Sequence, residues 1–255
     1  MASVTQRIKD VTQPRGGYVN PKQFSIVQLE DGVELNPEES INPALVGMAV
    51  DYLTRFTMGS PAKWAFKISL MGADIIGEGA LARKLLSKVK GLDDKSITSA
   101  VMLTGFDVCY RSSPLHYMPV DEIGPDRSTI ENIRTMVNRS LSFWRKYGPI
   151  VKDGFVFPGG YTDIVDAGDG DFLTKDTLWD FKVAKGNPTK NHTLQLLMYY
   201  IMGLHSESRD LFKDIKRLGI FNPRQNKVYL LNISDISCDV IQEVSTKVIG
   251  YRSHS

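Results

Sequence analysis

Two aspartates and a lysine in the segment GDGDFLTKDTLWDFKV are the residues whose types and spacing best suit catalysis. Short apolar runs flank Lys175 and Asp176, which predicts a β-hairpin with a tight turn at these two residues. A symmetric turn there places Asp171 directly opposite Asp180. Because side chains alternate along a strand, Lys182 shares the face of Asp180. The sequence therefore predicts two carboxylates and one ammonium group at a single spot.

Two aspartates that face each other across a hairpin repel, and a fold retains such a pair when a cation joins it. A hard divalent ion bound by Asp171, Asp180, the backbone carbonyl of Phe181 and water would satisfy more oxygen lone pairs than Lys182 alone. Ligation by oxygen atoms favours Mg²⁺ or Mn²⁺ over zinc. Such an ion would polarise a phosphodiester and lower the pKa of a bound water. Lys182 would then orient that water or stabilise the developing negative charge.

This arrangement resembles a known nuclease motif. Asp171, followed after eight residues by the Asp-Phe-Lys triplet at 180–182, is similar to the motif of the PD-(D/E)XK nuclease superfamily. Gln195 and Tyr199, about one helical turn apart in the next predicted helix, resemble the QxxxY motif of the RecB and Cas4-like branch of that superfamily. The resemblance covers about residues 126–235 and implies an α/β fold with a restriction-endonuclease-like αβββαβ core.

The resemblance also implies a Mg²⁺- or Mn²⁺-dependent enzyme that hydrolyses the phosphodiester bonds of nucleic acid, with DNA as the expected substrate. The catalytic residues carried over from the motifs are Asp171, Asp180, Lys182, Gln195 and Tyr199. The metal ligands carried over are Asp171, Asp180, the Phe181 carbonyl and Glu131, an acid of the preceding helix. Gln195 and Tyr199 would lie beside the site and hold Lys182 or the DNA backbone.

Several of these assignments have alternatives in the sequence. Glu131 also fits a capping box with Ser128 at the start of a helix. Asp163, in GGYTD, competes with Asp171 for the role of the first acid, because some members of the family separate the two acids by more residues. Gly170 stands where the family usually has a proline.

Basic residues near the predicted strand ends are candidate phosphate contacts. They are Lys185, Lys190 and Arg224. Solvated surface cations are the alternative interpretation of these three residues. A second class of function is a non-catalytic nucleic-acid- or protein-binding module that keeps the PD-(D/E)XK scaffold. The intact set of two acids and a lysine argues against that module, because a degenerate relative would be expected to lose one of the three.

The first 120 residues are expected to form a mainly helical N-terminal region or cap, and residues 121–255 the nuclease core. Up to about residue 40, prolines and glycines interrupt every helical period, which predicts an extended arm or an irregular cap. Helices are predicted from Asn42-Pro43, from Ser60-Pro61 towards Lys90, and over residues 94–102.

The predicted core follows the same order of helices and strands as the αβββαβ motif. Its elements are a helix over 128–147, strands over 155–165, 170–174 and 177–183, a helix from Asn187-Pro188, strands over 218–221 and 227–233, and a closing helix. The helix from Asn187-Pro188 would bury its apolar side and present Gln195 and Tyr199 on another.

The 255-residue chain carries 31 Lys and Arg against 29 Asp and Glu, so contact with nucleic acid needs a local basic patch. Its two cysteines and four histidines lack the spacing of a zinc site. No signal-peptide pattern is visible, and the longest uncharged run, Asn191–Ser206, is too short to cross a membrane. We therefore expect a cytoplasmic enzyme with no membrane partner. Because the chain has no GxxxxGK[ST] motif, a helicase or a defence-system component would be a separate partner.

Overall fold

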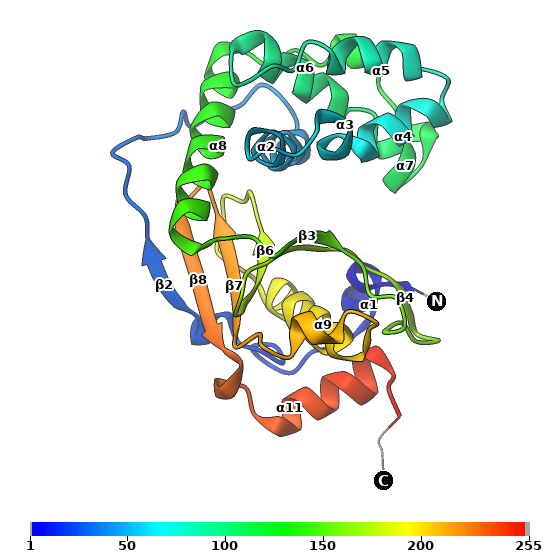
Figure 1. Ribbon diagram of the computed structural model, residues 1–255, viewed down its shortest axis with the longest axis vertical. Coiled ribbons are helices and arrows are strands. Elements are labelled where there is room, and N and C mark those ends of the chain that lie inside the picture. Colours follow the sequence, from blue (N-terminus) through cyan, green and yellow to red (C-terminus); the bar gives the residue numbers. More distant parts are fainter. Residues whose placement is uncertain (1, 253–255) are drawn as a thin grey trace. The chain divides into compact units, whose positions relative to one another are not determined.

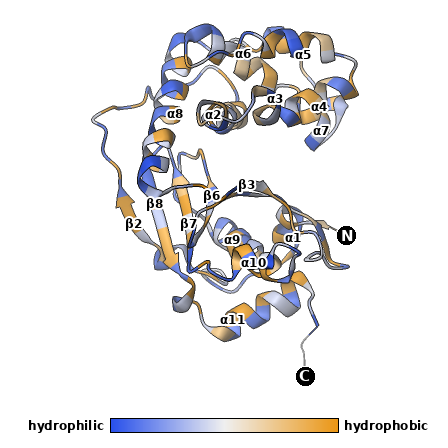
Figure 2. Cartoon of the chain, in the orientation of Figure 1, coloured by the Kyte–Doolittle hydropathy of each residue, from blue (hydrophilic) through white to orange (hydrophobic). Residues whose placement is uncertain are grey.

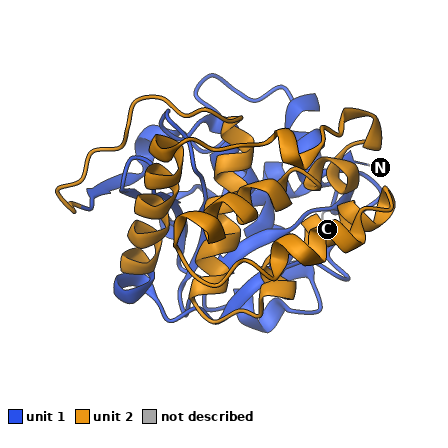
Figure 3. Cartoon of the chain, turned by 90° about the horizontal axis from the view of Figure 1, so that it is seen from above, with its two compact units in different colours: residues 1–29, 144–255 blue, residues 30–143 orange. Residues whose placement is uncertain are grey.

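The computed structural model describes residues 2–252, and the chain divides into two compact units (Figure 3). Unit 1 spans residues 1–29 and 144–255, and unit 2 spans residues 30–143. The protein is a mixed α/β protein with a helical region and a six-stranded mixed sheet followed by C-terminal helices. This division differs from the predicted boundary after residue 120, because the N-terminal residues join the sheet and most of one long helix belongs to the helical unit.

Unit 1 is built on the six-stranded sheet, in which the strands follow the order β2-β8-β7-β6-β5-β3 (Figure 1). The strands are β2 (Ser25–Gln28), β3 (Lys152–Phe155), β5 (Gly170–Leu173), β6 (Thr177–Phe181), β7 (Arg217–Asn222) and β8 (Lys227–Asn232). β6 and β7 run parallel, and the other neighbours are antiparallel. Parallel strands need a crossover, which α9 (Lys190–His205) provides. A further two-stranded parallel sheet joins β1 (Ala2–Ser3) to β4 (Val165–Ala167).

The hairpin of β5 and β6 has the predicted register. Phe172 lies opposite Trp179, as the symmetric turn requires. The backbone N–H of Thr174 donates to the carbonyl of Thr177 at 3.0 Å, which closes a two-residue turn. The alternation of side chains along β6 is therefore confirmed, with Trp179 on one face of the sheet and its neighbour Leu178 on the other.

Different helices cover the two faces of this sheet. On one face, α9 buries its apolar side against the strands. The helix α1 (Val4–Asp10) and the π-helical turn Val244–Ile249, which continues α11 (Cys238–Glu243), pack against α9 (Figure 1). On the other face, Trp144 at the end of α8 (Arg127–Tyr147) packs on Phe172, with ring centroids 4.7 Å apart. Asp180 alternates with Trp179 and therefore lies on the α9 face.

Unit 2 is helical, as expected for this part of the chain. Its helices are α2 (Pro43–Thr57), α3 (Ala62–Ala65), α4 (Lys67–Ile75), α5 (Gly79–Leu86), α6 (Asp94–Thr104), α7 (Asp107–Arg111) and α8 up to residue 143, with 3-10 turns at Pro114–His116 and Val120–Glu122. The helices of this unit carry both hydrophilic and hydrophobic residues (Figure 2). The start of α2 confirms the prediction, because the Asn42 side chain accepts a hydrogen bond from the Ala44 N–H.

The prediction of an irregular N-terminal arm is wrong. Ser3 caps α1, whose Val4 and Ile8 are buried, and a 3-10 turn at Pro21–Gln23 leads into β2. β2 pairs with β8, a strand about 200 residues away in the sequence. Local prolines and glycines carry no information about such a distant pairing, which is why the segment seemed irregular.

Three other local predictions also need correction. The strand predicted over 155–165 ends at Phe155, because Pro158 has no N–H and Gly159 adopts a φ of +77°. The helix predicted from Asn187-Pro188 begins at Lys190, after Thr189 as the N-cap. The Ser128 capping box does not form, and Asp126 instead accepts the Thr129 N–H at 2.8 Å.

Candidate functional site

Asp180 and Lys182 form an ion pair at the end of β6. The Nζ atom of Lys182 lies 2.8 Å from Oδ1 of Asp180. The Asp180 side chain is 3% exposed and that of Lys182 is 26% exposed. The backbone N–H of Lys182 donates to the carbonyl of Phe221 at 3.0 Å, so pairing with β7 continues one residue beyond β6. The sheet itself therefore holds both members of the pair.

The second carboxylate oxygen of Asp180, Oδ2, is buried and has no hydrogen-bond partner among residues 2–252. A buried acceptor without a partner costs about 1–3 kcal/mol, and more when it is charged. Burial raises the pKa of Asp180 to about 6, Lys182 lowers it, and Asp171 raises it further. At neutral pH the carboxylate is therefore mainly ionised, and one of its oxygens is free to accept a cation or a hydrogen bond.

Asp171 lies across the hairpin from Asp180, as predicted. Its Oδ2 atom accepts a hydrogen bond from the backbone N–H of Phe181 at 2.8 Å, which fixes the carboxylate at the end of β6. Burial lowers the pKa of Lys182, but Asp180 and Asp171 outweigh burial and hold that pKa above its usual value. Lys182 is therefore a stable cation between two carboxylates.

A metal ion at this site would have few protein ligands. Residues 2–252 contain no group of three or more His, Cys, Asp or Glu side chains placed to hold a metal. The donors available are the carboxylates of Asp171 and Asp180, with backbone carbonyls and water. Mg²⁺ is commonly bound in this way, through one or two carboxylates together with water and substrate phosphates. The unpaired Oδ2 of Asp180 is thus the atom best suited to a divalent cation.

The predicted QxxxY pair lies beside these carboxylates. Nε2 of Gln195 donates to the hydroxyl oxygen of Tyr199 at 2.8 Å. Tyr199 is 3% exposed. Burial raises the pKa of Tyr199, and the charges of Asp169, Asp180 and Asp171 raise it further, so the phenol stays protonated. A Cβ atom on Gly168, the residue before Asp169, would lie 3.4 Å from the Tyr199 ring, so this ring lies beside the segment that leads into β5. The structure thus brings together the five residues predicted to be catalytic.

Two further residues near the site, His192 and Asp169, were not predicted from the sequence. His192 precedes Gln195 by three residues and Tyr199 by seven, which places all three on one face of α9. Burial and Lys182 lower the pKa of His192 to about 4. Asp169 acts electrostatically on Lys182 and on Tyr199. The spacing of His192 was readable from the sequence, whereas the contribution of Asp169 required the structure.

Two other acids were candidates for the metal site, Glu131 and Asp163. Glu131 belongs to unit 2, where its Oε1 atom forms an ion pair with Nε of Arg127 at 3.0 Å. Asp163 is exposed in the segment between β3 and β4, and the aspartate that raises the pKa of Asp180 is Asp171. This favours Asp171 over Asp163 as the first acid.

The structure also explains why a glycine stands at position 170. Gly170 pairs with Phe155 of β3. A Cβ atom on Gly170 would lie 2.2 Å from the Phe155 ring, so a larger residue would displace that ring. The glycine at this position therefore has a packing cause.

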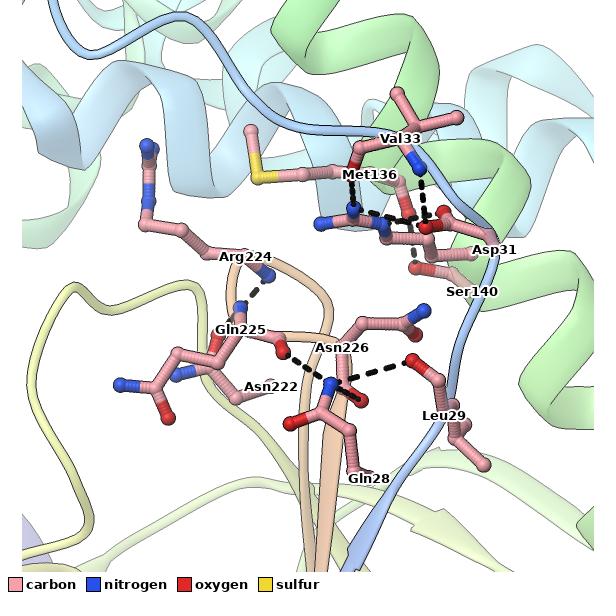
Figure 4. Close-up of polar contacts among 11 residues, drawn as sticks. Gln28, Leu29, Asp31, Val33, Met136, Ser140, Asn222, Arg224, Gln225 and Asn226 are labelled. Atoms are coloured by element: carbon pink, nitrogen blue, oxygen red, sulfur yellow. Dashed lines mark hydrogen bonds and ion pairs between the residues drawn. The ribbon is translucent and has the colours of Figure 1, made fainter.

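The three candidate phosphate-binding cations belong to unit 1. Lys185 and Lys190 are exposed and Arg224 is half-buried. The segment after Lys182 is tied to the β7–β8 turn by Asn222, whose Nδ2 donates to the Ala184 carbonyl at 2.7 Å. Gln225 of the same turn donates to the Lys185 carbonyl at 2.7 Å. Figure 4 shows Asn222, Arg224 and Gln225 grouped at this turn. Asn222 and Gln225 therefore hold in place the segment that carries Lys185.

Comparisons with protein-family models, curated proteins and solved structures gave no match to this chain. No helix among residues 2–252 is both long enough and apolar enough to cross a membrane. Any assignment of function therefore rests on the geometry of the site.

Proposed function

We propose that this protein is a nuclease that hydrolyses the phosphodiester bonds of nucleic acid, with DNA as the expected substrate and Mg²⁺ or Mn²⁺ as the cofactor. The observation that carries the proposal is the buried, unpaired Oδ2 of Asp180, next to Asp171 and the protonated Lys182. A purely structural ion pair would leave no reason to bury a carboxylate oxygen without a partner.

The order of elements supports a PD-(D/E)XK core. Along the chain, α8, β3, β5, β6, α9 and β7 follow one another as helix, three antiparallel strands, helix and strand. The short β4, which belongs to the other sheet, interrupts this order. The first acid lies on β5, the D-x-K triplet at the end of β6, and the QxxxY pair on α9. These are the positions that the resemblance to the RecB and Cas4-like branch implies.

The side chains of the site have distinct roles in the proposed reaction. When bound by Asp171 and Asp180, the metal supplies Lewis acidity and a water of lowered pKa. Lys182 remains protonated and would stabilise the negative charge that develops on the phosphate. Because Gln195 donates to the Tyr199 oxygen, the phenolic proton of Tyr199 remains available to a carboxylate or a phosphate.

The charge of unit 1 is consistent with a nucleic-acid partner. This unit carries 19 Lys and Arg against 14 Asp and Glu, whereas unit 2 carries 12 against 15. Within unit 1, Lys185, Lys190 and Arg224 are proposed to contact the phosphate backbone, which would position the substrate without reading its sequence. A helicase or a defence-system component, if one takes part, would be supplied by another chain.

The proposal is tested by incubating linear duplex, circular duplex and single-stranded DNA with the protein in Mg²⁺, Mn²⁺ or EDTA. We expect metal-dependent cleavage by the wild type and its loss in Asp180→Ala and Lys182→Ala. Asp163→Ala, which removes an exposed acid of the same unit, is the matched control and should cut normally. Cleavage that survives both site variants would refute the proposed site.

The second candidate function is a non-catalytic binding module on the same scaffold. The observation that favours it is the lack of a third acidic or histidine ligand at the site among residues 2–252. A wild type that cuts none of the DNA substrates, and whose melting temperature is the same in Mg²⁺ and EDTA, would establish this function in place of the nuclease.

A further inference from the structure

His192 has a defined hydrogen-bonding state. Its Nδ1 atom accepts the backbone N–H of Thr189 at 3.2 Å, in the manner of a capping box at the start of α9. An Nδ1 atom that accepts a hydrogen bond carries no proton. The proton of the neutral ring is therefore on Nε2, which becomes a donor.

The surroundings of His192 keep the ring neutral. The residue is half-buried, and burial together with the positive charge of Lys182 lowers its pKa to about 4. His192 shares one face of α9 with Gln195 and Tyr199, and both of these lie beside the acidic cluster. The nuclease mechanism above gives this ring no role, although it lies on the face of α9 that carries Gln195 and Tyr199.

We propose that His192 is a substrate-binding residue whose Nε2–H donates to a non-bridging oxygen of the nucleic-acid phosphate held next to Lys182. This inference rests on the proposed nuclease function. A second cation beside Lys182 would be repelled by it, whereas a neutral N–H adds a hydrogen bond to the phosphate at no such cost. His192 and Lys182 would thus act on one phosphate as a neutral and a charged donor.

The capping role of His192 allows an experiment that separates structure from substrate binding. Gln and Glu are the usual residues at this position of a capping box, so His192→Gln and His192→Glu should keep the bond to the Thr189 N–H. His192→Ala removes it. We expect the Gln and Glu variants to melt like the wild type and the Ala variant to melt about 2–5 °C lower.

The three variants at residue 192 should rank differently in cleavage activity than in melting temperature. With Mg²⁺ and the DNA substrate that the wild type cuts best, we expect kcat/KM to fall about 10-fold in His192→Ala. It should fall further in His192→Glu, because a carboxylate repels the phosphate, and least in His192→Gln, whose amide still donates. His205→Gln is the matched control on α9, because His205 stacks on Tyr251, and it should keep wild-type kcat/KM.

Binding separates failure of this inference from failure of the nuclease proposal. The affinity for a fluorescent single-stranded DNA oligonucleotide is measured in EDTA by anisotropy, for the wild type and the three variants at residue 192. Weaker binding by His192→Glu than by the wild type supports the phosphate contact even if the wild type cuts nothing. Wild-type affinity and wild-type kcat/KM in His192→Glu would overturn the inference and leave His192 only as the cap of α9. The inference is also overturned if the wild type neither cuts nor binds nucleic acid.

Discussion

Among residues 2–252, each unit contains one buried aspartate, Asp107 in unit 2 and Asp180 in unit 1, and the hydrogen bonding of the two carboxylates differs. In unit 2, both oxygens of Asp107 accept hydrogen bonds, from Ser69 at 2.6 Å and from Tyr52 at 2.5 Å. In unit 1, Asp180 pairs with Lys182 through one oxygen only, and its other oxygen has no partner among residues 2–252. Burial raises the pKa of both carboxyl groups.

The difference between the two aspartates lies in what their carboxylate oxygens contact. Asp107 joins α7 to α2 and α4 through Tyr52 and Ser69, and Nε of Arg111 also lies 3.4 Å from its Oδ2. Both oxygens of Asp107 therefore have a partner. Asp180 is nearly as deeply buried, yet its Oδ2 atom has no hydrogen-bond partner among residues 2–252 and can accept a ligand. Burial and a raised pKa are common to both residues, so they do not identify a site. The unpaired Oδ2 atom is the feature that distinguishes Asp180 from Asp107.

The largest expected effect is on cleavage. Asp180→Asn should lower the rate of Mg²⁺-dependent DNA cleavage by about 1,000-fold or more, because one of the two carboxylates proposed to bind the metal is lost. Asp107→Asn should keep the wild-type rate per folded molecule. The measurement is the initial rate on the DNA substrate that the wild type prefers. Equal rates in the two variants would remove the functional distinction between the two aspartates.

The next largest effect is on stability, and here the substitution of Asp107 is expected to matter. Asp107→Ala should lower the free energy of unfolding by about 1–3 kcal/mol, because the Tyr52 and Ser69 hydroxyls are left buried without their acceptor. Urea denaturation monitored by circular dichroism provides this value. A loss below about 0.5 kcal/mol would show that the Asp107 network contributes little to the fold.

A smaller effect is expected on the melting temperature when metal binds, and it should differ between variants of Asp107 and Asp180. Millimolar Mg²⁺ is expected to raise the melting temperature of the wild type by about 2–4 °C relative to EDTA, because the ion binds only the folded state. Asp107→Asn should retain this shift, and Asp180→Asn should lose it. Differential scanning fluorimetry of the three proteins makes the comparison. A shift that persists in Asp180→Asn would place the metal elsewhere.

The smallest effect is a dependence of stability on pH in the absence of metal. The pKa of Asp180 is about 6 in the folded protein, above the value near 4 of an unfolded chain. The folded state therefore binds this proton more tightly, and stability falls as the pH rises from about 4 to 6. Asp180→Asn cannot titrate. The melting temperature of this variant in EDTA, minus that of the wild type, should therefore increase by a few °C from pH 4 to pH 7. A constant difference would show that the carboxyl titrates normally.

The sequence was sufficient for the parts of the site that depend on local geometry. The turn at Lys175 and Asp176 sets the register of the hairpin, and strand alternation then places Asp180 and Lys182 on one face. Helical spacing similarly places Gln195 beside Tyr199. Each of these relations spans ten residues or fewer, so neighbouring residues determine it.

Relations between distant segments could not be predicted in this way. The pairing of β2 with β8 made the N-terminal residues part of unit 1, whereas their prolines and glycines had indicated an irregular arm. Glu131, which the family resemblance implies as a metal ligand, pairs with Arg127 in unit 2, and its role at the site stays a prediction. A pattern within one segment contains no information about what packs against it.

The sequence by itself therefore determined how Asp171, Asp180 and Lys182 face one another, which is the arrangement on which the proposed hydrolysis rests. Only the tertiary structure decided that Asp180 is buried with one oxygen unpaired, and that His192 lies close enough to Lys182 for its pKa to fall. Burial and long-range electrostatic interactions depend on every element that packs around a residue, and those elements come together only when the chain folds.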